Sequence, residues 1–336
     1  MNRVKLGFKR WLIGGLAAMV MLPLLIAFPV SSGAAQTLTP LKLVLGWYPT
    51  PEYGGLYAAI SQGYFNAAGI NLTVQEGGPQ VSPTAVVGSG SAQIGYLDND
   101  EAIMLARQNG IPVTEFATTF QVYPEGIEYH SSHPISSFKQ MNGKTLSAVT
   151  GSVDYEWLQA KYALKNQVVP YSYATFAHNT SSFLLGYVTD DVPTLAAQGV
   201  KIGYKLISSS GLNPYADVLF GLTSYVHSNS KLLTKFDGAL GKGWQYYRNH
   251  YHQVDLVIFK AANTTPMSVN DAIAKTEDSF IYGGLATTMG IGSISASRVA
   301  QTYASLRALH VITKTMSISD IADTALVPKL LPPKKS

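Results

Sequence analysis

Apolar and polar positions alternate in short runs along the first part of the chain, and these runs are separated by stretches with helical spacing. Residues 41–45 read Leu-Lys-Leu-Val-Leu, a pattern typical of a strand, and Leu56, Ala59, Ile60 and Gly63 then share one helical face. The same reasoning predicts strands at 70–74, 92–97 and 112–119, and helices at 83–87 and 99–108. Strands separated by helices predict an α/β fold with a mainly parallel sheet.

The pattern restarts after residue 135. Strands are predicted at 145–149, 170–174 and 201–207, with helices at 136–141 and 155–165 and helical pieces near Ser181 and Pro193. A second α/β unit therefore follows the first.

The last third reads as helices at 232–249, 254–262, 269–278 and 297–309. These helices lack strands of their own, so we expect them to pack on the first unit. The chain would then cross between units twice, near Tyr123–Pro134 and Leu219–Val226. The predicted division is 36–128 with 226–331 as lobe 1, 129–225 as lobe 2, and 332–336 as a flexible tail.

The N-terminus has the features of a secretory signal peptide at residues 1–35. Four basic residues precede residue 11, residues 11–30 are apolar apart from two prolines, and small residues follow. An uncleaved membrane anchor is the alternative, because twenty apolar residues can span a bilayer. Cleavage is favoured, and it predicts a protein free in the periplasm.

Charge and cysteine content narrow the class of protein. The chain has 24 basic and 20 acidic residues, and removal of the predicted leader leaves the two balanced. The formal charge of +4 therefore gives no support for nucleic-acid binding. The chain has no cysteine, which excludes both disulfides and a lipid-modified cysteine.

Several segments resemble one family in order and spacing, from 45–49 and 53–59 through 63–70, 88–95 and 107–112 to 243–247. These are the periplasmic binding proteins of importers for sulfonates, nitrate, taurine and thiamine-pyrimidine precursors. The resemblance implies a two-lobed periplasmic-binding-protein fold of type II, with ligand held at strand ends from both lobes. Open α/β sheets also place ligands beyond the carboxyl ends of their strands.

The loops after the first and third strands supply the first candidate ligand contacts. Trp47 and Tyr53 offer aromatic faces that can stack on a planar ligand. In the pyrimidine-precursor branch the position of Tyr53 is commonly His, which leaves the exact ligand open. Asp98 can accept hydrogen bonds from an amino-heterocycle, while Asn99 is equally suited to the pocket or to capping the next helix.

Later loops supply the remaining candidates. Thr119 and Gln121 follow the fourth strand, and Gly151-Ser152 precedes a helix whose backbone N–H groups could hold an anion. Ser152 could equally be an ordinary cap, and Tyr155 lies one turn further. Two more candidates come from the second lobe, Asn179 and Asp191. Family members often have Glu-Pro where this chain has Val192-Pro193, and Asp191 is the substitute for that acid.

Other chemistry is not indicated. His130 and His133, like His250 and His252, have no accompanying cysteine or tight carboxylate cluster, so no metal site is predicted. Glycine pairs at 88–90 and 290–292 lack the third glycine of a dinucleotide turn. No nucleophile elbow is present, and we expect neither a cofactor nor catalysis.

We therefore expect a monomeric solute-binding protein that delivers a small planar heterocycle of thiamine-pyrimidine-precursor type to an inner-membrane permease of an ABC importer. A binding protein for an aliphatic sulfonate, taurine or nitrate is the alternative. All four arginines of the predicted mature chain lie outside the predicted loops, which disfavours an anion. Rivals of other classes are a pyrimidine-synthase-like enzyme, whose cysteine-rich motif is missing here, and a sensory domain.

Overall fold

The computed structural model describes residues 37–333. The predicted signal peptide, with its cleavage or retention, and residues 334–336 of the predicted tail lie outside these residues. Among the described residues, none of the helices has the length and apolar character needed to cross a membrane.

The first sheet has five strands in the order β2-β1-β3-β10-β4. β1 runs parallel to β2 and β3, whereas β10 runs antiparallel to both β3 and β4. β10 therefore lies inside the sheet although it comes last in the chain. The strands are β1 (Thr39–Val44), β2 (Ile70–Gln75), β3 (Ile94–Asn99), β4 (Val113–Phe120) and β10 (Ala216–Leu222).

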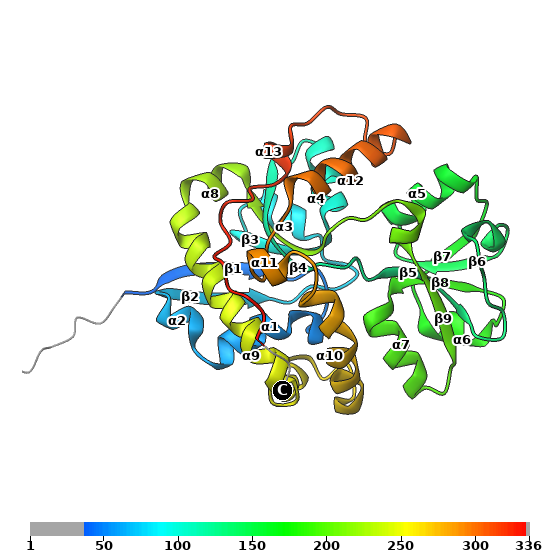
Figure 1. The fold of residues 1–336 in the computed structure, drawn as a ribbon, viewed down its shortest axis with the longest axis horizontal. Helices are drawn as coiled ribbons and strands as arrows, with labels where there is room; N and C mark the ends of the chain where they lie inside the picture. The colour runs from blue at the N-terminus through cyan, green and yellow to red at the C-terminus, as the bar shows by residue number, and fades with distance from the viewer. Residues whose placement is uncertain (1–36, 334–336) are drawn as a thin grey trace, which may run out of the picture. The chain divides into compact units, whose positions relative to one another are not determined.

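The second sheet also has five strands, in the order β7-β6-β8-β5-β9. Here β5 is the antiparallel strand, between β8 and β9, and helices α5, α6 and α7 surround the sheet (Figure 1). The elements are β5 (Glu125–His130), η2 (Phe138–Met141), β6 (Thr145–Ala148), α5 (Val153–Tyr162), β7 (Gln167–Pro170), α6 (Tyr173–His178), β8 (Phe183–Tyr187), α7 (Val188–Ala197), β9 (Ile202–Leu206) and η3 (Ile207–Ser210).

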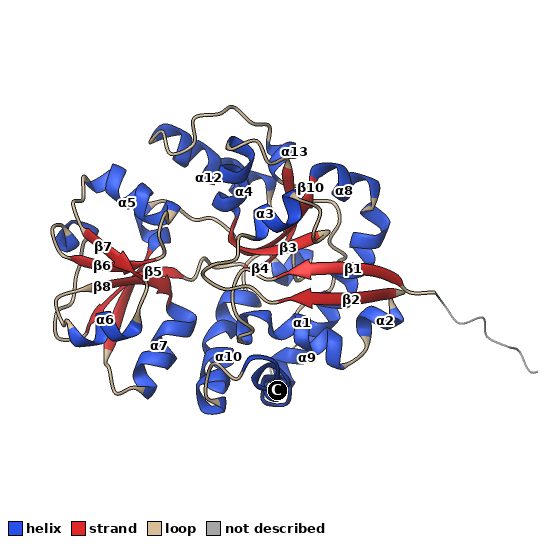
Figure 2. Ribbon diagram, turned by 180° about the vertical axis from the view of Figure 1, so that it is seen from behind, coloured by secondary structure: helices blue, strands red, loops and turns tan. Residues whose placement is uncertain are grey.

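Short helices connect the strands of the first sheet, and the C-terminal helices cover it (Figure 2). The connecting helices are η1 (Pro51–Tyr53), α1 (Gly54–Ser61), α2 (Tyr64–Ala67), α3 (Pro83–Gly88) and α4 (Asp100–Gln108). The C-terminal helices are α8 (Thr223–Ser228), α9 (Ser230–Ala262), α10 (Met267–Ile281), α11 (Ala286–Met289), α12 (Ala296–Ala308) and α13 (Ile318–Ile321).

The longest helix, α9, packs closely on α1. A Cβ atom on Gly243 would lie 2.0 Å from the backbone oxygen of Gly55, so glycine is needed where these helices meet. As predicted, the C-terminal helices pack on the first sheet and its helices, but α10 also contacts α7 beside the second sheet.

The α/β, two-lobed prediction is confirmed, with several corrections. Each sheet is mixed: four of its five strands run in one direction, as predicted, while β10 in the first sheet and β5 in the second run against their neighbours. Residues 173–178 form a helix where a strand was predicted to reach residue 174, and β8 begins at Phe183 where a helical piece was predicted. The break predicted between the helices at 232–249 and 254–262 is confirmed, because α9 is kinked at His250, whose backbone dihedrals are not helical.

The second crossover also differs from the prediction. β10 already belongs to the first sheet at Ala216, so the chain returns before residue 219. The first crossover lies between Phe120 and Glu125, at the start of the predicted segment. The lobe boundaries at 128/129 and 225/226 stay a prediction.

Candidate functional site

A cavity of about 590 Å³ lies between the two sheets. This volume falls in the range of pockets that hold small molecules, ~300 to 1,000 Å³. Its walls come from loops at the ends of strands in both sheets and from the start of α10. The lining residues are Trp47, Tyr48, Thr50, Glu52, Asp98, Asn99, Ala102, Leu105, Glu125, Val149, Thr150, Gly151, Ser152, Val153, Asp154, Tyr171, Tyr173, Leu185, Gly186, Tyr187, Asp190, Asp191, Thr194, Gln198, Thr264, Thr265, Pro266 and Ile273.

The loop after β1 brings Trp47 to the cavity, and two hydrogen bonds to the backbone of Trp47 fix its position. The backbone N–H of Trp47 donates to the hydroxyl of buried Tyr53 at 3.0 Å. The backbone oxygen of Trp47 accepts from Gly77 at 3.1 Å. A Cβ atom on Gly77 would lie 2.2 Å from the oxygen of Leu45, so the two loops can meet only through glycine.

A chain of hydrogen bonds connects the end of β3 in the first sheet with α5 beside the second sheet; each sheet with its helices is called a half below. The Oδ1 atom of Asn99 caps α4 by accepting from the Ala102 N–H at 3.0 Å, and its Nδ2 donates to Tyr123 at 3.2 Å. The Tyr123 hydroxyl in turn donates to Oδ2 of Asp154 on α5 at 2.8 Å. Asn99 therefore both caps the helix and lines the cavity.

On the second half, two tyrosines hold one carboxylate. The hydroxyls of Tyr171 and Tyr173 each donate to Oδ1 of Asp191 at 2.6 Å. A Cβ atom on Gly186 would lie 2.2 Å from Oδ2 of Asp191, so the carboxylate occupies the space that glycine leaves open. The aromatic faces of Trp47, Tyr171 and Tyr187 also line the cavity.

Burial raises the pKa of the cavity carboxyls. The pKa of Asp191 is raised to about 6, and that of Asp154 and of Asp190 to about 7, because the protein displaces water around the charged form. Burial, and then like-charged neighbours, raise the pKa of Glu52 and Glu125 well above the ordinary range. Helix N-termini oppose this cost at Asp154, Asp190 and Asp191, which lie in the first turns of α5 and α7.

Five of the ten predicted ligand contacts line this cavity: Trp47, Asp98, Asn99, Ser152 and Asp191. Ser152 also caps α5, with its hydroxyl accepting from the Tyr155 N–H at 3.4 Å. Contact with ligand stays a prediction for these residues.

The other five lie away from the cavity lining and make structural contacts instead. Tyr53 holds the β1 loop, and the buried Tyr155 hydroxyl accepts from the backbone of Asn166 at 3.2 Å. Gln121 donates to the Ser293 carbonyl at 3.1 Å, and Asn179 bonds to Ser181 on an exposed turn. We therefore leave these side chains out of the site proposed below.

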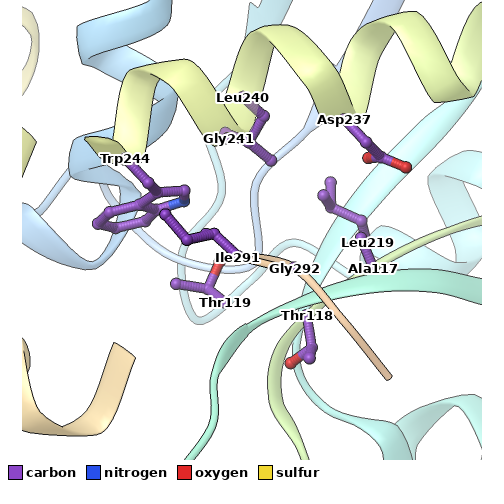
Figure 3. A pocket seen from close by; sticks show the side chains of 10 residues that line it. All are labelled: Ala117, Thr118, Thr119, Leu219, Asp237, Leu240, Gly241, Trp244, Ile291 and Gly292. Carbon is purple, nitrogen blue, oxygen red and sulfur yellow. The ribbon is translucent and has the colours of Figure 1, made fainter. Parts of the chain in front are cut away.

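Thr119, the fifth of these residues, lines a separate small void of about 10 Å³ beneath α9 (Figure 3). Its hydroxyl pairs with that of Tyr96 at 2.9 Å. Asp237 and the Nε1 atom of Trp244 face the same void and have no hydrogen-bond partner among the described residues. The void has room for about one water-sized sphere and is too small for a ligand.

Four of the six cavity carboxylates and three of its tyrosines are not among the residues predicted from the sequence. Tyr171 and Tyr173 fall inside the strand predicted at 170–174, so they are not predicted as loop residues. In the structure β7 ends at Pro170, and the position of both tyrosines just after a strand is the signal that could have identified them. Glu52 stands in the aromatic loop already singled out, and Asp154 and Asp190 are neighbours of predicted residues. The missed residues that matter most are Glu52, Glu125, Asp154, Tyr171, Tyr173, Tyr187 and Asp190.

Within residues 37–333, no group of three or more histidine, aspartate or glutamate side chains is arranged to hold a metal ion. His130 is buried and bonds to the carbonyl of Phe176 at 2.9 Å, and His252 pairs with Asp271 at 2.8 Å.

A protein-family model described as NMT1/THI5 like matches residues 50–253. Among curated proteins, the chain is 24% identical over 221 residues to the riboflavin-binding protein RibY of Chloroflexus aurantiacus, covering 62% of this chain and 63% of that protein. It is 22% identical over 230 residues to the formylaminopyrimidine-binding protein of Halalkalibacterium halodurans, covering 63% and 67%.

The chain also matches an enzyme, over a shorter stretch of sequence. The chain is 27% identical over 128 residues to a 4-amino-5-hydroxymethyl-2-methylpyrimidine phosphate synthase of Saccharomyces cerevisiae, covering 37% of each protein. The chain thus spans less than two thirds of the length of RibY and of this synthase.

Among solved structures, the periplasmic aliphatic sulphonate binding protein SsuA of Escherichia coli is similar, with a TM-score of 0.63, 15% identity, and 83% of this chain and 96% of that one covered. This similarity confirms the periplasmic-binding-protein fold.

Proposed function

Because the chain belongs to the NMT1/THI5-like family, we propose that it is a solute-binding protein that holds a small planar heterocycle between its two sheets. The observation that carries this proposal is the cavity of about 590 Å³, whose lining combines aromatic faces with carboxylate oxygens from both halves. Aromatic faces stack on a flat ring, and carboxylate oxygens accept from its amino groups. Trp47, Asp98, Asn99, Tyr171 and Asp191 are the proposed contacts.

A ligand that touches both halves stabilises the arrangement in which they face each other. Asp98 and Asn99 belong to the first sheet, whereas Tyr171 and Asp191 belong to the second. Binding therefore shifts the population toward the closed arrangement. We propose that a permease of an ABC importer recognises this arrangement on a monomer in the periplasm.

We propose the thiamine-pyrimidine-precursor type of ligand over an aliphatic sulfonate, taurine or nitrate. The cavity lining contains no lysine, arginine or histidine. The helix N-terminus at Ser152, which an anion would need in place of a cation, carries buried Asp154 in its first turn. A relative that is named for binding a formylaminopyrimidine supports the same choice.

We propose binding rather than catalysis. The relatives named as binding proteins match over more than 60% of this chain, whereas the yeast synthase matches over 37%.

Thermal unfolding with a panel of compounds tests the proposal. The panel contains aminopyrimidines, riboflavin, an alkanesulfonate, taurine and nitrate. A bound compound at a hundredfold excess over its Kd adds about 2.7 kcal/mol of stability, which shifts the midpoint visibly. A shift with a planar heterocycle and none with the anions supports the proposal, and a shift with the anions alone contradicts it.

A further inference from the structure

The charge on the cavity wall is all of one sign. Six carboxylates line it, and no lysine, arginine or histidine does. Glu52 and Asp98 come from the first sheet and its loops, Glu125 lies on β5, and the others lie on α5 and α7. The six are Glu52, Asp98, Glu125, Asp154, Asp190 and Asp191.

These carboxylates have no cationic partner within the described part of the chain. The ion pairs there join Arg107 to Asp320, Arg248 to Asp278 and His252 to Asp271, and none includes a cavity residue. Arg298, which lies near the crossover, donates to backbone oxygens of Gln121 and Pro214. Negative charge in the cavity therefore meets no cationic side chain of the described residues, although burial favours the neutral form of Glu52 and Glu125.

One of these carboxylates keeps an oxygen without any hydrogen-bond partner. Oδ1 of Asp154 is buried and unpaired within residues 37–333, whereas Asp190 shares a hydrogen bond with Glu52 and Asp191 shares one with Glu128. Asp154 is only 3% exposed and Asp191 1% exposed. A buried acceptor without a partner costs free energy, and a buried charge costs more, unless something else pairs with it.

We propose that the occupant of this cavity is a cation: a planar ring that carries a protonated amino group. This inference rests on the proposed function and names its ligand class more narrowly. The ammonium group pairs with the carboxylates, and the ring lies against the aromatic faces of Trp47 and Tyr171. Aromatic faces attract cations as well as flat rings, so both kinds of wall residue favour the same ligand.

Two pyrimidines that differ at one group test the inference. The probes are the 5-aminomethyl and 5-hydroxymethyl forms of 4-amino-2-methylpyrimidine, which are similar in size, while only the first carries an ammonium group at neutral pH. Titration calorimetry on the purified protein gives both Kd values. We expect the aminomethyl form to bind about tenfold more tightly or better, because hydrogen bonds between charged groups exceed neutral ones.

The failures of the two proposals differ in this experiment. Equal or tighter binding of the hydroxymethyl form overturns the cation inference and leaves the proposed heterocycle function standing. If neither probe binds and no planar compound shifts the unfolding midpoint, the proposed function fails, and the cation inference fails with it.

Substitutions locate the charge that matters. Asp98→Asn and Asp191→Asn keep the side-chain shape and remove one negative charge each at neutral pH, so each should reduce the preference for the aminomethyl probe. Glu156→Gln is the matched control, because Glu156 is exposed on α5 and lies outside the cavity lining. Circular dichroism verifies folding. An unchanged preference in both cavity variants, or an equal loss in the control, overturns the inference.

Discussion

The rings of Trp47 and Tyr171, which come from opposite sheets, meet edge to face with centroids 6.4 Å apart and planes 80° apart. Trp47 follows β1 and Tyr171 follows β7, so this contact exists only when the two halves face each other. The edge-to-face arrangement leaves the face of one ring of the pair free for a ligand.

Replacing Trp47 with alanine should weaken ligand binding without unfolding the protein. The indole is half-buried at the cavity, and aromatic contacts contribute ~0.5 to 1.5 kcal/mol beyond area burial, so a loss of about tenfold in affinity is expected. Calorimetry with the aminopyrimidine probes measures it. Tyr204→Ala removes an exposed ring on β9 and serves as control; an unchanged affinity in Trp47→Ala would contradict the stacking role.

Gly186→Ala should displace the side chains of Asp191 and Tyr171 at the cavity. The new methyl group would lie 2.2 Å from Oδ2 of Asp191 and 3.1 Å from Cε2 of Tyr171, so both side chains must move. Overpacking of this kind costs about 1 to 3 kcal/mol of stability, and denaturant unfolding and ligand titration should both show a loss. Gly238→Ala, where the added atom would meet nothing closer than 3.7 Å, should show neither. Normal binding by Gly186→Ala would argue against the position of Asp191.

The ligand-free protein should lose stability as the pH rises from 5 to 8. Burial raises the pKa of Asp191 to about 6 and those of Asp154 and Asp190 to about 7, from an ordinary value of 3.8. The folded chain therefore binds these protons more tightly than the unfolded chain, and the stability they provide is complete below the unfolded pKa and lost through pH 6 to 7. Thermal unfolding at several pH values measures the trend.

A variant checks the origin of this pH dependence. Asp190→Asn removes one carboxyl with a raised pKa, so its unfolding midpoint should change less between pH 5 and pH 8 than that of the unaltered chain. An equally steep or steeper dependence would show that other groups cause it.

Asp237→Asn should stabilise the protein at alkaline pH. Both carboxylate oxygens of Asp237 are buried without a partner among the described residues, and burial raises the pKa of the carboxyl well above its ordinary value. Asparagine is uncharged at every pH, whereas ionisation of Asp237 would place a buried charge there. The gain in free energy of unfolding should therefore be near zero at pH 4 and on the order of 1 to 3 kcal/mol at pH 8. Urea unfolding at both pH values decides, and a loss of stability at pH 8 would contradict the prediction.

The sequence pattern predicts the strands and helices of the first sheet well, because β1 to β4 follow one another with clear punctuation. It misses β10, since Ala216–Leu222 is a single apolar run whose partners lie about a hundred residues earlier. Such a run reads equally as the end of one unit or the start of the next. Sheet membership depends on pairing, which local pattern does not contain.

Some residues of the candidate site could be predicted from local sequence pattern, and others could not. Trp47, Asp98 and Asn99 could be predicted because they directly follow predicted strands. Tyr171 could not, because Tyr173 begins a helix in a stretch that was read as a strand. The concentration of carboxylates is visible only in three dimensions, since Glu52, Glu125 and Asp190 lie far apart in the sequence.

The late position of β10 also sets an order of assembly. β4 pairs with β10 on one side and forms a bridge through Glu115 to Ala322 on the other, so both neighbours of β4 come from residues beyond 215. The strands of the second sheet, in contrast, all lie between residues 125 and 206. The second half can therefore fold while the chain is still emerging, whereas β4 must wait for the C-terminal part, and contacts so distant in sequence make that step slow.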